Sequence, residues 1–155
     1  MTRQAQPRAW QRQRGATAVE FALVFPLFFL IFYAIVTFGL IFAVQQNLTL
    51  AATEGARAAL NYIPADTPQA ALTSRADAAC HTALSLTQWL PNMSKPTCQA
   101  LQKCSYDPSM YCVTVTVTYP YAQYPLVPSL PLLGLAVPSA LTSTATVQIN
   151  PANII

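Results

Sequence analysis

The feature that most constrains this chain is an apolar run from Phe21 to Val44, which contains no charged side chain. A helix rises about 1.5 Å per residue, so a run of this length reaches past the roughly 30 Å hydrocarbon core of a bilayer. We therefore predict a transmembrane helix and assign residues 16–44 to it.

The segment before the run is basic. Residues 1–14 contain four of the eight basic residues and no acidic residue. Because basic flanks tend to stay in the cytoplasm, we expect a cytoplasmic N-terminus and an extracytoplasmic domain over residues 45–155. Without this arm, four basic residues stand against five acidic ones, which leaves a formal charge of −1. The membrane is therefore an expected partner and nucleic acid is not.

Four cysteines follow the run, all on the side that we expect to be oxidising: Cys80, Cys98, Cys104 and Cys112. Disulfides are the expected state of cysteines in such a compartment. The spacing contains no C-x-x-C and the chain has one histidine, so we predict no metal site and no cofactor.

The pairing of these cysteines has three possible solutions. If the turn signal at residues 107–109 folds a short strand back on itself, Cys104 faces Cys112, and Cys80 is left to pair with Cys98. We take this pairing as the working hypothesis.

The first helix is expected to continue beyond the membrane, because after Val44 no helix breaker occurs until Pro64. This gives one helix of about 45 residues, with Glu54 and Arg57 paired on one face. The opposite face carries a stripe of mostly small apolar residues: Leu48, Ala52, Ala56, Ala59 and Ile63. We expect the outer domain to pack closely against this stripe.

A second helix is predicted to begin with Thr67 as N-cap and Pro68 as first residue, and to end near Trp89. We expect Arg75 and Asp77 to face solvent. The expected buried stripe consists of Leu72, Ala76, Ala79, Ala83 and Leu86.

Two segments alternate apolar and polar residues with a period of two, which predicts half-buried antiparallel strands. They are Tyr111–Tyr119 and Leu141–Ile149, and a third, short strand is expected near Leu101–Ser105. The fold class is therefore α+β, with a long N-terminal helix, a second helix and a disulfide-stapled sheet of two or three strands.

The connection over residues 120–138 contains five prolines and many apolar residues. It is too apolar for a solvated linker. Either it covers the sheet, or it presents an apolar patch to a partner or to the membrane surface.

Signatures of an enzyme are absent from the sequence. The chain has four glycines, no phosphate-binding glycine loop, and no motif that joins an acid, a base and a nucleophile. We predict a protein without catalytic activity.

The residues before the apolar run place one carboxylate, Glu20, against the hydrocarbon. A carboxylate costs about 2.5–3.5 kcal/mol at the bilayer centre and less near an interface, and usually has a partner. Glu20 either reaches the headgroups, or it meets a new α-amine produced by cleavage between Gly15 and Ala16.

The basic leader, Gly15, the following residues Ala16 to Phe21 and the apolar helix together resemble the processing site of type IV prepilins. In particular, they resemble the TadE-like minor pseudopilins of tight-adherence (Tad/Flp) pilus systems. The motif Ala-x-x-Glu-Gly-Ala-Arg at residues 51–57 and the threonine-valine strand that ends in Tyr-Pro-Tyr at 119–121 extend the likeness.

The resemblance implies that a prepilin peptidase removes leader 1–15 by cleaving after Gly15. Glu20 would be the fifth mature residue and, with Phe21, would set subunit registry. The protein would join or prime a pilus at the bacterial inner membrane, together with other pilus subunits and assembly machinery, and its domain would be periplasmic. The rival hypothesis is an uncleaved, signal-anchored binding protein that uses the loop at 120–138.

Overall fold

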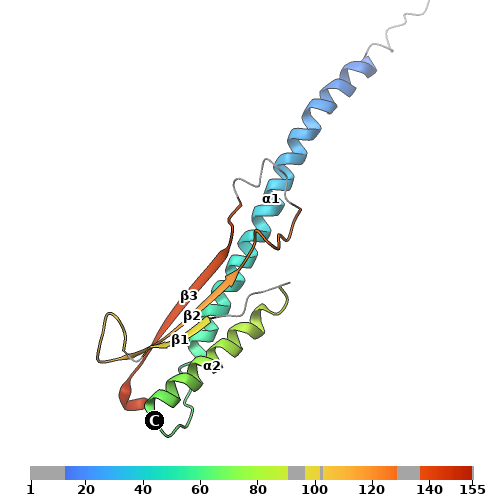
Figure 1. Ribbon diagram of the computed structural model, residues 1–155. Helices are drawn as coiled ribbons and strands as arrows, with labels where there is room; N and C mark the ends of the chain where they lie inside the picture. Colours follow the sequence, from blue (N-terminus) through green and yellow to red (C-terminus); the bar gives the residue numbers. More distant parts are fainter. Residues whose placement is uncertain (1–12, 91–96, 102, 129–136, 155) are drawn as a thin grey trace, which may run out of the picture. The chain divides into compact units, whose positions relative to one another are not determined.

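The computed structural model describes residues 13–90, 97–101, 103–128 and 137–154. The chain divides into two compact units, Met1–Gly39 and Leu40–Ile155. Its elements are α1 (Gln13–Ala58), α2 (Pro68–Thr87), β1 (Thr97–Leu101), β2 (Tyr111–Tyr119), β3 (Leu141–Ile149) and a 3₁₀ turn, η1 (Pro151–Asn153) (Figure 1). The predicted α+β class is confirmed.

Helix α1 has 46 residues, close to the predicted length, and it continues through Pro26. It ends at Ala58, before the proline that was expected to stop it. The amides of Leu60 and Asn61 bond to carbonyls three residues back, at 3.0 and 3.2 Å, so the last turn tightens and the helix closes there.

Helix α2 begins as predicted. The Thr67 hydroxyl accepts a 3.2 Å hydrogen bond from the Ala70 amide, and Pro68 occupies the first turn, where a missing N–H costs nothing. The helix ends at Thr87, two residues before the predicted end. The predicted stripe lies on the inner side: Leu72, Ala76, Ala79 and Ala83 are buried and Leu86 is partly buried.

The sheet is antiparallel, in the order β1-β2-β3. Strands β2 and β3 have the predicted bounds and pair without a bulge from Tyr111 opposite Ile149 to Tyr119 opposite Leu141. The inner face of β2 carries three fully buried valines, at positions 113, 115 and 117. The outer face carries cross-strand threonine pairs whose hydroxyls lie 3.0–3.2 Å apart: Thr114–Thr146, Thr116–Thr144 and Thr118–Thr142. Such pairs stabilise a solvated sheet face.

The third strand, β1, lies at Thr97–Leu101, so the prediction of a strand at Leu101–Ser105 is wrong in its bounds. Residues near Cys104 belong instead to the turn that precedes β2, because the Cys104 amide bonds to the Met110 carbonyl at 2.9 Å. The side chains of β1 lie outside the described part of the chain.

The helices cover one face of the sheet, and Gly55 of α1 lies where the two helices and the sheet approach one another closely (Figure 1). A Cβ at this position would lie 2.9 Å from the Ala79 carbonyl oxygen, 3.1 Å from the Ala83 Cβ and 3.3 Å from a Val115 methyl. Two helices and the central strand therefore meet there with no space for a side chain. The expectation that the domain packs on the small-residue stripe is confirmed for Leu48, Ala52, Ala56 and Ala59, which belong to the core. The fifth predicted member, Ile63, lies beyond the end of α1 and is only partly buried.

The proline-rich connection is anchored at both ends. Ala122 donates a 2.9 Å backbone hydrogen bond to Ser139, and Leu126 and Val137 pack against the core. The sequence left two alternatives for this connection, a cover over the sheet or an exposed apolar patch. Both concern mainly residues 129–136, which are not among those described.

Candidate functional site

The candidate site lies at the start of α1. Gly15 is exposed, and a Cβ placed on it would meet no heavy atom within 4 Å. The leader up to residue 12 and the side chain of Ala16 are outside the described part of the chain. The predicted processing position therefore lies within the first turns of α1, and no heavy atom of the described residues crowds Gly15.

Glu20 is exposed, and within residues 13–90, 97–101, 103–128 and 137–154 it has no hydrogen-bond or ion-pair partner. It shares one helix face with Thr17 and Val24, at spacings of three and four, and adjoins Phe21. The carboxylate is thus displayed on the same surface as apolar side chains.

An aromatic ridge, Phe21-Phe25-Phe29-Tyr33, starts beside this carboxylate. Its ring centroids are 5.3, 6.3 and 6.4 Å apart, because a spacing of four residues places side chains one above the other. The three phenylalanines are about half exposed or more, at 64, 49 and 52%. The ridge is therefore available to lipid or to another helix.

Helix α1 also contains the segment, Thr17–Ala58, that is long and apolar enough to cross a membrane, judged by length and composition. Pro26 lies within it and lacks the N–H that would bond to the carbonyl four residues earlier, a defect that transmembrane helices tolerate. The chain thus has the composition of a single-pass membrane protein.

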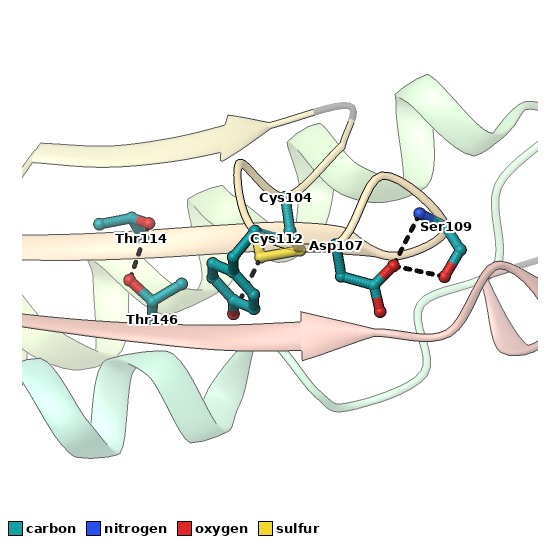
Figure 2. The surroundings of a disulfide bond; sticks show 7 residues. Cys104, Asp107, Ser109, Cys112, Thr114 and Thr146 are labelled. Carbon is teal, nitrogen blue, oxygen red and sulfur yellow. Dashed lines mark hydrogen bonds between the residues drawn. A yellow bond between two sulfur atoms is a disulfide. The ribbon is translucent and has the colours of Figure 1, made fainter.

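A second structured feature is the turn that joins Cys104 to Cys112. The two cysteines form a disulfide with a Cα–Cα distance of 5.1 Å, as the working hypothesis predicted (Figure 2). Cys80 is also disulfide-bonded, but the side chain of Cys98 is not among the described ones, and this second pair stays a prediction.

Within this turn, Asp107 Oδ1 accepts hydrogen bonds from the hydroxyl and the amide of Ser109, at 2.6 and 2.9 Å (Figure 2). These bonds stabilise the charged carboxylate, the side-chain bond most, and they lower the pKa of Asp107. The Tyr106 hydroxyl lies 3.5 Å from the Cys112 sulfur. These contacts fix the turn.

Arg75 is buried, contrary to the prediction from the sequence. Its side chain is 2% exposed, so the prediction that it faces solvent is wrong, whereas Asp77 is exposed as predicted. The guanidinium donates to the carbonyls of Asn153 and Ile154, at 3.0 and 3.3 Å. Arg75 lies three residues after Leu72, so its spacing places it on the buried stripe, and the C-terminal segment supplies the polar partners that make its burial possible.

No group of His, Cys, Asp or Glu that could hold a metal ion occurs in the part of the chain that the structure describes.

Burial raises the pKa of Tyr119, with a smaller contribution from neighbouring Tyr121. The Tyr119 hydroxyl donates to the Tyr124 carbonyl at 2.8 Å, a structural role.

These features define a class of protein: a small disulfide-bonded α+β domain built on an N-terminal helix that is apolar enough to cross a membrane once. Residues 15–57 match the sequence profile of a family described as TadE-like protein. The match includes Gly15, Glu20 and the motif at 51–57, and it confirms the resemblance to TadE-like proteins. Neither a curated protein nor a solved structure shows significant similarity to the chain.

Proposed function

We propose that this protein is a minor pseudopilin-like component of Tad/Flp pilus biogenesis. It acts without catalysis, by assembly through α1 at the bacterial inner membrane after cleavage that follows Gly15. The observation that carries the proposal is Glu20: a carboxylate within the TadE-like segment, beside an exposed aromatic ridge and without a partner among the described residues.

A carboxylate at the edge of the hydrocarbon needs a neutralising group. Cleavage would create such a group, an α-amine at Ala16, four residues from Glu20 on the same helix. The amine of the same chain or of a neighbouring subunit can then meet Glu20 at a similar depth. The aromatic ridge that starts at Phe21 supplies apolar contact area for the neighbouring helix.

The proposal also specifies partners and topology. Prepilin peptidase removes leader 1–15 on the cytoplasmic side, and other pilus subunits and the assembly machinery bind the mature chain. The domain lies in the periplasm, an oxidising compartment in which the Cys104–Cys112 disulfide is expected to persist.

Cleavage is tested by replacing Gly15 and measuring the N-terminal mass. Gly15→Val should leave the leader attached, whereas the natural chain should begin at Ala16. A Cβ at position 15 meets no heavy atom of the described residues within 4 Å, so we expect the variant to keep the fold of the domain. Gly39→Val is the matched control, because position 39 is equally free of neighbours and lies far from the cut. A natural chain that begins only at Met1 would favour the signal-anchored binding protein instead.

Assembly is tested with Glu20→Gln, which keeps the shape of the side chain and removes its charge. Co-purification of pilus subunits with this variant should fall strongly while membrane insertion is retained. Glu54→Gln is the control: Glu54 is also on α1, but it pairs with Arg57 at 3.2 Å on an exposed surface. Equal recovery of partners with both variants would reject a role for Glu20.

A further inference from the structure

One exposed aromatic side chain of the domain is fixed in its position along α1. Trp89 is 57% exposed, yet its Nε1 donates a 3.1 Å hydrogen bond to Asn47 Oδ1. Asn47 lies three residues after Val44, where the apolar run ends. All three residues belong to the unit Leu40–Ile155, so the indole is tied to the end of the run.

The sheet reaches the same level of α1. Gln45 Nε2 donates to the Thr142 carbonyl at 3.1 Å, and the Leu141 next to it pairs with Tyr119. The proline-rich connection therefore leaves the sheet beside residue 45. Its first turn carries Tyr124, which is 41% exposed.

This end of the domain carries no charge in the described residues. Helix α1 has no charged residue between Glu20 and Glu54, and none occurs in 82–90, 113–128 or 137–149. Among the described residues of α1, the first charged one after Asn47 is Glu54, seven residues beyond it, or about 10 Å along the helix. An uncharged rim with exposed Trp and Tyr is typical of membrane–water interfaces, where the ring meets apolar atoms and its polar group stays hydrated.

Distances along α1 indicate how deep this end of the domain lies in the bilayer. Asn47 is about 22 Å along α1 from the midpoint of the run Phe21–Val44. The hydrocarbon extends about 15 Å from the bilayer centre, and the headgroup layer extends to about 20–22 Å. At about 22 Å along the helix, Asn47 can lie no farther out than the outer part of the headgroup layer, and any tilt brings it deeper.

We propose that this end of the domain, marked by Trp89, Tyr124 and the anchored ends of the connection at Leu126 and Val137, lies in the headgroup layer of the bilayer. Trp89 is the anchor that sets the height of the domain. This inference rests on the membrane span of the proposed function. The partner of this end of the domain is a lipid surface.

The test uses Trp89 as its own probe. The chain has two tryptophans, so Trp10→Phe leaves Trp89 alone. The full-length variant is reconstituted in phosphatidylcholine vesicles that carry a spin label either near the headgroup or at the end of the acyl chain. We expect the shallow label to quench Trp89 more strongly than the deep one, and iodide on both sides of the membrane to quench it weakly.

The control moves the single tryptophan to Tyr62, which is 65% exposed and lies after the end of α1. In Trp10→Phe/Trp89→Phe/Tyr62→Trp, iodide should quench several-fold more than at position 89, and neither lipid label should quench. Two results overturn the inference while the protein still floats with the vesicles: iodide quenching of Trp89 equal to that at position 62, or protection from iodide without lipid quenching. Failure to float would reject the span itself, together with this inference.

Discussion

Gly55→Ala should destabilise the domain, although alanine is the better helix former. The new Cβ would lie 2.9 Å from the Ala79 carbonyl oxygen, a backbone atom that can move only with α2. It would also lie 3.1 Å from the Ala83 Cβ and 3.3 Å from a Val115 methyl, so atoms of both α2 and β2 would have to give way.

The magnitude follows from two opposing effects. Overpacking a close-packed site costs about 1–3 kcal/mol, and replacing a helical glycine by alanine returns about 0.8–1 kcal/mol. We expect a net loss of about 1 kcal/mol in the free energy of unfolding, which lowers the Tm of a domain of this size by roughly 4 °C.

The assay is thermal unfolding of the full chain in detergent micelles, followed by near-ultraviolet circular dichroism, which reports on the packing of tyrosines in the domain. Gly39→Ala is the matched control, because a Cβ at position 39 meets nothing within 4 Å and the Tm should stay unchanged or rise. A Tm for Gly55→Ala equal to that of the natural chain, or higher, would refute the reasoning.

Three further outcomes are expected. Arg75→Met should weaken the attachment of the C-terminal segment by about 1.5–3 kcal/mol, the usual worth of a hydrogen bond to a charged group, and hydrogen exchange should speed up in η1 more than in α2. Tyr119→Phe should cost about 0.5–1.5 kcal/mol by removing the bond to Tyr124. Because the folded state raises the pKa of Tyr119, stability should fall as pH rises above its ordinary value of 10.0, and the variant should lose that part of the decline. The folded state lowers the pKa of Asp107 through Ser109, so its stabilisation is present above the ordinary pKa of 3.8 and is lost as pH falls below it; Asp107→Asn should show a shallower acid-side loss of Tm.

The elements that sequence predicted well are those that depend on neighbours along the chain. Strands β2 and β3 have the predicted bounds because alternating valines and threonines specify one buried and one solvated face. Helix α2 begins at the predicted cap because Thr67 and Pro68 act within one turn. The Cys104–Cys112 pair followed from a turn that spans only a few residues.

The predictions that failed or were incomplete concern contacts between distant segments. Arg75 was expected in solvent on its residue type, but its acceptors come from residues 78 and 79 positions later. The short strand lies four residues earlier than expected, because the disulfide turn takes up the residues around Cys104. No local pattern contains the acceptors of Arg75, whereas the strand was misplaced over residues that belong to a local turn.

The apolar span, the basic arm, the TadE-like segment, the bounds of β2 and β3 and the start of α2 can be read from the sequence, because spacing and capping are properties of adjacent residues. Three contacts are visible only in the folded domain: α2 and β2 meet at Gly55, Arg75 holds the C-terminal segment, and Trp89 bonds to Asn47. Each of these joins residues more than 20 positions apart. Which segments meet depends on packing the whole domain, where burial and polar pairing must be satisfied together.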